Sequence, residues 1–402
     1  MDDNRPQASY ASAAGDDFAS APAGTAFLER GGEMGRRMRA FDWAATPLGP
    51  PRAWPQSLKT VVRLLLDSRY AMWMLWGPDL TFFCNDAYLP TVGIRRDWVL
   101  GARSDKVWAE VWPDVGPRIA HVLATGEATW DQGLMLLLER SGYPEETYHT
   151  FSYSPVYDDA GSVAGMLCVV TEDTERRISE RRIGLLGAIG AELALTNSET
   201  DVFAGAARHL DGVPDLPCAL VFMRGAGGVQ CVLRTGFDGA EGSASARIED
   251  APWPVADVLA SGVAQTIELD ARFGNLPCGP WPEAPRTALL LPIQQQGHAQ
   301  PAGVFVACLN RYRPLDDAYR RFLGLLAAQI ASAVGNARSY ADERRRAQAL
   351  AEIDRAKTAV SELVNASSAP IAPSSPMRRS LMRRSVSSVT THNMPATLPV
   401  SS

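Results

Sequence analysis

The sequence predicts an α+β fold of two tandem sensory-type domains, each an antiparallel sheet with flanking helices, joined and followed by long helices. Three observations predict it. Short apolar runs of strand-like composition, separated by turn residues, occur in two blocks. A helical pattern at residues 174–196 lies between the blocks. A second helical pattern, at residues 316–364, follows them without any proline.

The composition is that of a soluble globular protein. Hydrophobic residues make up 46% and charged residues 21%, and 402 residues are enough for two domains of ordinary size. The net charge of -6 argues against binding to nucleic acid. No apolar run reaches the roughly 18 residues of a transmembrane helix, and the first residues lack the pattern of a secretory signal. We therefore expect a cytoplasmic protein that binds neither nucleic acid nor membrane.

The first domain is expected at residues 41–173. Residues 1–40 are rich in Ala, Ser, Gly and Asp, so we expect them to be disordered. A proline-rich stretch then leads into an amphipathic helix that Ser57 could cap. Two apolar runs around a Gly-Pro-Asp turn at residues 72–85 predict a hairpin. Short helices follow, and three strands are predicted within residues 128–173.

The second domain is expected at residues 197–315. Residues 174–196 should form a connector helix, because apolar residues in its second half fall on one face. The second domain repeats the mixture of strands and helices of the first. Residues 365–402 contain no acidic residue and are mostly Ser, Thr, Pro and Ala, so we expect a disordered tail.

The pattern at residues 316–364 predicts a helix of roughly 70 Å, longer than one domain needs. Apolar or small side chains recur at steps of three and four residues, which places them on one face. The first half could pack on a domain, whereas the second half is rich in Arg, Glu and Ala and is typical of a coiled-coil arm. The predicted contacts between two copies are Leu326, Ile330, Ala333, Ala337, Leu350 and Ile353.

Several segments carry a resemblance to known families. The hairpin MWMLWGPDLTFFCNDAY, the block LGARSDKVWAEVW and the strands of TFSYSPVYDDAGSVAGMLCVVTEDTER resemble a PAS domain. The lead-in ATPLGPPRAWPQSL is similar to that of cytoplasmic bacterial sensor histidine kinases of the hybrid type. The second domain resembles a GAF domain, and its end, from GVFVACLN to IDRAKTA, is similar to the junction between GAF and kinase domains in that group. The resemblance covers residues 41–359.

The resemblance implies a phosphoacceptor helix and an ATP-binding domain after this point. Here Ala359 is followed by VSELVNASSAP, and no histidine occurs between His298 and His392. No DxGxG-type segment occurs either. Phosphoryl transfer to histidine requires an acceptor imidazole and a nucleotide site. We therefore expect a chain truncated before both domains and without intrinsic kinase activity.

The sequence assigns no catalytic residue, no metal ligand and no cofactor. The histidines are scattered, without metal-ligand spacing. His149 lies in a predicted strand and faces either a ligand cavity or the surface, and we expect the surface; haem ligation by His121 or His149 is an alternative. Cys84 lacks the context of flavin-reactive PAS domains. The motifs of bilin-binding and cyclic-nucleotide-binding GAF domains are absent, and the six cysteines are expected to be buried thiols.

Two further groups have alternative interpretations. The tryptophans of the first domain either line a small-molecule pocket or fill its core, and we expect the core; they are Trp73, Trp76, Trp108, Trp112 and Trp130. Glu139, Glu145 and Glu146 are either acid–base groups or a solvated loop rim, and we expect the rim.

The predicted function is that of a sensory input module of a two-component system. A ligand or partner cue would pass through the PAS and GAF domains to the coiled-coil output helix. One alternative is a sensor histidine kinase, by family membership. Another is a dimerisation partner that modulates an intact kinase in trans. The expected partners are a second copy of the chain, a sensor histidine kinase or response regulator, and an unknown small ligand.

Overall fold

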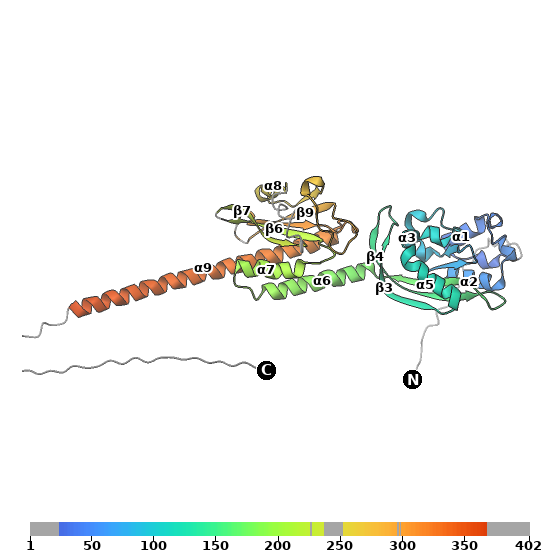
Figure 1. Cartoon of the computed structure of the whole chain (residues 1–402), viewed down its shortest axis with the longest axis horizontal. Helices are drawn as coiled ribbons and strands as arrows, with labels where there is room; N and C mark the ends of the chain where they lie inside the picture. The colour runs from blue at the N-terminus through green and yellow to red at the C-terminus, as the bar shows by residue number, and fades with distance from the viewer. Residues whose placement is uncertain (1–23, 226, 237–251, 296, 298, 368–402) are drawn as a thin grey trace, which may run out of the picture. The chain divides into compact units, whose positions relative to one another are not determined.

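The computed structural model describes residues 24–225, 227–236, 252–295, 297 and 299–367 (Figure 1). It contains two five-stranded antiparallel sheets with flanking helices, and a long C-terminal helix, which confirms the predicted fold class. The sheet orders are β2-β1-β5-β4-β3 and β7-β6-β10-β9-β8. Counted within its own domain, each sheet therefore has the same strand order. Among the described residues, no helix combines the length and apolar character needed to cross a membrane.

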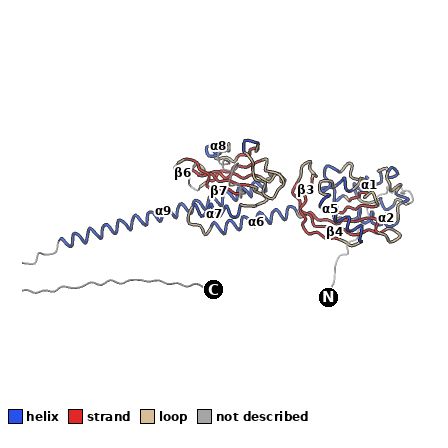
Figure 2. Tube along the Cα trace, in the orientation of Figure 1, coloured by secondary structure: helices blue, strands red, loops and turns tan. Residues whose placement is uncertain are grey.

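The first sheet is shown in Figure 2. Its strands are β1 (Ala71–Trp76), β2 (Thr81–Cys84), β3 (Thr129–Leu138), β4 (Glu145–Tyr157) and β5 (Val163–Glu172). The flanking helices are η1 (Ala26–Leu28), α1 (Gly32–Ala40), η2 (Trp43–Ala45), η3 (Pro51–Ala53), α2 (Gln56–Asp67), η4 (Asp86–Tyr88), α3 (Leu89–Val92), η5 (Gly93–Arg95), α4 (Ser104–Val107) and α5 (Trp112–Thr125). The predicted hairpin and the three later strands are all present.

The expectation of disorder up to residue 40 is wrong for residues 24–40, which form η1 and α1. The few large apolar side chains of this segment are buried in the domain core; they are Phe27, Leu28, Met34 and Met38. Asp86 caps α1, because its carboxylate accepts hydrogen bonds from the backbone nitrogens of Glu33 and Met34 at 2.8 and 2.7 Å. The expectation of disorder rested on average composition, which does not show that a few side chains are buried or that a helix is capped. Residues 1–23 lie outside the described residues.

Helix α2 is capped by a residue far from it in sequence. Ser57, the expected cap, lies inside the first turn. Asp159, between β4 and β5, accepts hydrogen bonds from the backbone nitrogens of Gln56 and Ser57 at 3.0 and 2.8 Å. The carboxylate satisfies two of the amides that a helix N-terminus leaves free, and it ties α2 to the sheet.

The second domain contains α7 (Glu199–Leu210), β6 (Cys218–Gly225), β7 (Gly228–Thr235), α8 (Val255–Ser261), β8 (Gln265–Glu268), η7 (Ala271–Phe273), β9 (Thr287–Ile293) and β10 (Gly303–Cys308). Alternate residues of β6 face opposite sides of the sheet. Val221 packs in a core formed with α6, α7 and the first turns of α9, and Leu220 packs in a smaller core with α8.

Two long helices join and follow the domains. α6 (Thr174–Leu193) runs from the end of β5 to the second domain, and α9 (Asp317–Ser367) is 51 residues long. Of the described residues, those up to Ala341 belong to one compact unit and those from Asp342 to another. Within the second unit, the side chains of Leu350 and Ile353 are 65% and 52% exposed. Residues 368–402, most of the expected disordered tail, lie outside the described residues.

The first half of α9 corrects the predicted contacts between two copies. The side chains of its four predicted contact residues are buried inside the chain's own second-domain core; they are Leu326, Ile330, Ala333 and Ala337. A face that packs on its own domain is not available to a second copy. The periodicity was that of an amphipathic helix on a domain, which resembles a coiled-coil pattern over two or three turns.

Candidate functional site

A small cavity lies inside the first domain, lined by residues of β1, β3, β4, β5 and α5. Its volume is about 30 Å³, which is room for one or two water molecules. Aromatic rings and one histidine form much of its wall: Trp73, Tyr88, Trp108, His149, Phe151 and Tyr153.

The aromatic wall is a packed cluster. The ring of Trp73 stacks on that of Tyr88 at 6.3 Å and meets the ring of Tyr153 edge-on at 5.8 Å. The indole Nε1 of Trp108 is buried and has no hydrogen-bond partner among the described residues. A buried donor without a partner costs free energy, so this indole is an unsatisfied polar group on a residue of the cavity wall.

His149 is buried and lines this cavity, so the expectation of a surface ring is wrong. Its Nε2 lies 3.1 Å from the hydroxyl of Thr147. Burial lowers the pKa of His149 to about 4, although nearby Glu172 opposes this shift. The ring is therefore neutral near pH 7. Burial also raises the pKa of the Cys168 thiol and the Tyr153 hydroxyl, so these groups of the wall are uncharged as well.

Strand β4 has the cavity on one face and α6 on the other. His149, Phe151 and Tyr153 line the cavity. Because successive side chains of a strand point to opposite faces, Tyr148 and Thr150 lie on the other side. There the guanidinium of Arg177 lies 5.6 Å from the ring of Tyr148, and the hydroxyl of Thr150 donates to Asp173 at 2.5 Å.

The first residues of β4 extend beyond the end of β5, whose last pair joins Glu172 to His149. The backbone of Tyr148 is satisfied there by the start of α6: its nitrogen donates to the Thr174 hydroxyl at 2.9 Å, and its oxygen accepts from the Asp173 nitrogen at 2.8 Å. The nitrogen of Glu146 donates to the oxygen of Tyr312 at 2.9 Å, a residue of the second domain. The open edge of the strand is thus covered by two other parts of the chain.

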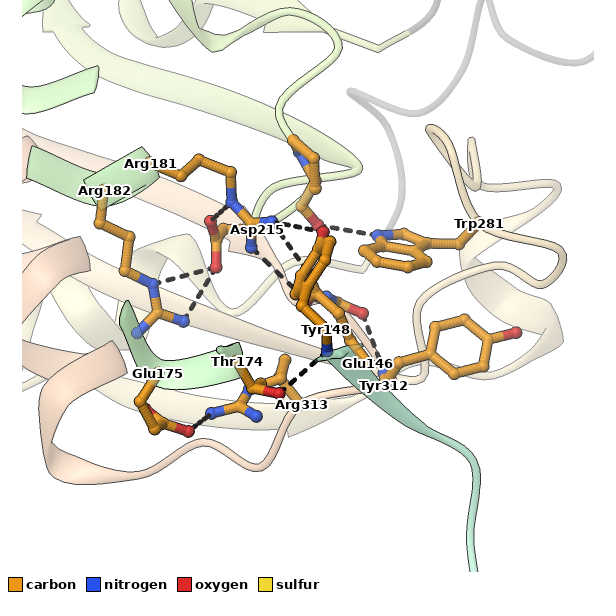
Figure 3. A network of polar contacts seen from close by, with 12 residues as sticks. Glu146, Tyr148, Thr174, Glu175, Arg181, Arg182, Asp215, Trp281, Tyr312 and Arg313 are labelled. Carbon is orange, nitrogen blue, oxygen red and sulfur yellow. Dashed lines mark hydrogen bonds and ion pairs between the residues drawn. The ribbon is translucent and has the colours of Figure 1, made fainter. Parts of the chain in front are cut away.

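A buried ionic network joins β4, α6 and the second domain (Figure 3). Arg181 bridges two carboxylates: its Nη1 lies 2.7 Å from Oε1 of Glu146, and its Nε lies 2.7 Å from Oδ2 of Asp215. Arg182 binds Oδ1 of Asp215 at 2.8 Å. Both carboxylates are fully buried. Two positive and two negative side chains balance, as burial of charge requires.

The structure also corrects the expectation for the three glutamates. Glu139 is exposed, but Glu145 and Glu146 are buried rather than on a solvated rim. Their neighbours explain the difference: Glu145 accepts from Arg140 at 3.1 Å, and Glu146 binds Arg181. The sequence contained part of this information, since both glutamates begin the alternating strand EETYHTFSY. The arginine partners of the two glutamates lie outside this strand and could not be recognised from the sequence.

The remaining candidates divide into buried and exposed groups. Trp73 and Trp108 line the cavity, while Trp130 is 66% exposed. Of the six cysteines, four are buried as expected, and Cys231 and Cys278 are partly exposed. Within the described ranges, no three His, Cys, Asp or Glu side chains gather in a group that could hold a metal ion.

Comparisons with known proteins agree with the first domain's fold. Residues 66–178 match the profile of the family described as the PAS fold. No curated protein matches the chain.

Three solved structures share limited similarity with the chain. The GAF domain of a phosphoenolpyruvate-protein phosphotransferase from Acinetobacter is 18% identical over 39% of this chain and 94% of that one, with a TM-score of 0.30. The GAF domain of a protein described as a sensor histidine kinase, from Pseudomonas syringae pv. tomato, is 19% identical over 44% and 97%, with a TM-score of 0.29. A sensory box sensor histidine kinase from Vibrio cholerae is 13% identical over 29% and 92%, with a TM-score of 0.22.

Proposed function

We propose that this chain is the sensory input module of a signal-transduction system, with the cavity of the PAS-fold domain as its input. The observation that supports this most is the position of β4. One face of the strand lines the cavity, and the other face holds α6 through Tyr148, Thr150 and Glu146. A change of packing in the cavity would therefore reach α6 across a single strand.

The proposed mechanism needs two states that a cue distinguishes. A cue that enters the cavity displaces His149 or Phe151, which alternate along β4 with the residues that hold α6. The first half of α6 then shifts relative to the first sheet, because the helix is hydrogen-bonded to β4 at Thr174 and Arg181. The shift passes to the second domain through the buried face of α6.

We propose further that residues 197–315 are a GAF-like sensory domain. Its resemblance in sequence and the strand order that it shares with the first domain support this. The module would act in the cytoplasm as a homodimer, on a sensor histidine kinase or a response regulator of a two-component system. The exposed apolar side chains of Leu350, Ile353 and Val360 support a coiled-coil contact in the second half of α9.

Hydrogen–deuterium exchange tests the proposed input. Phe151→Leu alters the cavity wall without adding charge, and Val62→Ala is a matched core truncation on α2, away from the cavity. We expect Phe151→Leu, but not Val62→Ala, to speed exchange in α6. Equal effects of the two variants on α6 would contradict the proposal.

A further inference from the structure

The loop between β10 and α9 contacts the first domain. We propose that the first domain acts directly on the start of α9 through this loop, in parallel with the route along α6. This goes beyond the serial order of cavity, α6, second domain and α9 in the proposed function. Three sets of contacts carry the inference, and a fourth joins the loop to α6.

The first contact is a backbone hydrogen bond from β4 to the loop. Glu146 lies where β4 has no partner strand on one edge, and its nitrogen donates to the oxygen of Tyr312 at 2.9 Å. The side chain of Tyr312 is buried, with its ring 5.3 Å from that of Trp281. The loop is thus fixed against the first sheet by an interaction that does not involve α6.

The second contact is made by the side chain of Asn310, which is buried. Its Nδ2 donates to Oε2 of Glu146 at 2.8 Å, and its Oδ1 accepts from the nitrogen of Tyr312 at 2.9 Å. A buried hydrogen bond to a charged group is worth more than a neutral one. Asn310 therefore couples the shape of the loop to the position of the Glu146 carboxylate.

The third contact leads from the loop into α9. The backbone nitrogen of Asn310 donates to the hydroxyl of Tyr319 at 3.1 Å, and Tyr319 lies fully buried in the first turn of α9. The same hydroxyl donates to the backbone oxygen of Asp215. The guanidinium of Arg182 lies 4.2 Å from the Tyr319 ring. Movement of Asn310 thus acts on the beginning of α9.

The fourth contact holds the loop against α6. Nη2 of Arg313 donates to Oε1 of Glu175 at 2.6 Å, and the arginine side chain is only 7% exposed. Asp316 then caps α9 by accepting from the nitrogen of Tyr319 at 2.8 Å. The loop is therefore held against α6 at Arg313 and joined to α9 through the cap at Asp316.

The carboxylate of Glu146 is the branch point of the two routes. One oxygen binds Arg181 on α6, and the other accepts from Asn310 in the loop. A displacement of β4 consequently moves the start of α6 and the start of α9 together. The route through Asn310 does not require a prior change inside the second domain. A cue in the first domain and a cue in the second can therefore act on α9 independently.

The experiment separates the two routes by changing Asn310. Asn310→Asp keeps the acceptor for the Tyr312 nitrogen but places a carboxylate against Glu146. The double variant Glu146→Gln/Asn310→Asp moves the negative charge from one residue to the other and restores a donor–acceptor pair. Each is combined with Phe151→Leu in the full chain, and hydrogen–deuterium exchange is measured in α6 and in residues 317–326.

We expect Phe151→Leu alone to speed exchange in both regions. In the Asn310→Asp background, the change in exchange that Phe151→Leu causes at residues 317–326 should fall at least about threefold. The change in α6 should persist. In the Glu146→Gln/Asn310→Asp background, the change at residues 317–326 should be recovered. If Asn310→Asp folds poorly, Asn310→Ser shortens the side chain without adding charge and serves the same comparison.

Two results would overturn the direct route. One is a response at residues 317–326 that is the same with and without the Asn310 change. The other is no response there to Phe151→Leu in the otherwise unchanged chain. In either case, a persisting response in α6 leaves the proposed function standing, whereas loss of the α6 response contradicts the proposed function itself.

Discussion

Arg181 connects the two domains at the scale of a single residue. Its guanidinium has two fully buried carboxylate partners, Glu146 of β4 and Asp215 of the second domain. Burial disfavours the charged form, but the hydrogen bonds that Arg181 donates to both carboxylates more than offset this and raise its pKa. The planar fork of an arginine suits this double role, and a lysine would not reproduce it.

Arg181→Met should therefore destabilise the chain by about 3 to 5 kcal/mol, since it leaves the Glu146 carboxylate buried without its charged partner. The free energy of unfolding from urea titration measures this. Arg176→Met is the matched control on the same helix, because Arg176 pairs with Glu180 at the surface. The urea midpoint of Arg176→Met should not change. Equal losses of unfolding free energy in the two variants would refute the buried network.

His149 makes stability depend on pH in a defined window. Its ordinary pKa is 6.5 and its pKa in the fold is about 4. Between these values the unfolded chain binds the proton and the fold does not, so stability should fall as the pH falls from 6.5 to 4, by up to about 3 kcal/mol. Burial would raise the pKa of Glu172, but the hydrogen bond from Arg140 lowers it, so Glu172 contributes only at more acidic pH.

The control for this prediction is His149→Gln. It keeps a polar side chain in the cavity wall but removes the titration, so the variant should lose less stability than the parent between pH 6.5 and 4.5. Parallel stability curves for the two proteins over that interval would show that His149 does not carry the effect.

At the scale of elements, α9 has two halves with different environments. The first half packs on its own domain, with Leu326 and Ile330 fully buried. The second half exposes Leu350 and Ile353. The same spacing of apolar residues thus occurs in a half that packs on its own domain and in a half that is exposed. Only the burial of each side chain distinguishes the two.

Leu350→Glu/Ile353→Glu should convert the expected dimer to monomers in sedimentation while leaving the unfolding midpoint unchanged, because both side chains are exposed within the chain. Leu326→Ala should do the opposite: it should cost about 2 to 5 kcal/mol of stability through the cavity it leaves and preserve the sedimentation behaviour. A dimer that survives the double glutamate variant would rule out this contact.

Much of the fold was predictable because it depends on local patterns. The alternation in the β4 sequence and the apolar runs of β1 and β10 predict strands directly. The site was less predictable, because its partners are distant in sequence. Glu146 meets Asn310, and Arg181 meets Asp215, only once both domains have folded. The helix at residues 32–40 was missed because it depends on a few well-placed buried side chains, which average composition does not reveal.

At the scale of the whole molecule, the proposed function depends on coupling between the two faces of β4. The coupling energy between Glu146 and Arg181 reports the face that holds α6, and Phe151 lies on the face that lines the cavity. The two faces can be measured separately, since Phe151 is not part of the ionic network.

The most direct test is a double-mutant cycle of Glu146→Gln and Arg181→Met, measured by urea unfolding with Phe151 unchanged and again with Phe151→Leu. If β4 transmits the cue, the coupling energy between Glu146 and Arg181 should differ between the two backgrounds by more than the ~0.5 kcal/mol expected for independent sites. The same coupling energy in both backgrounds would contradict transmission across β4.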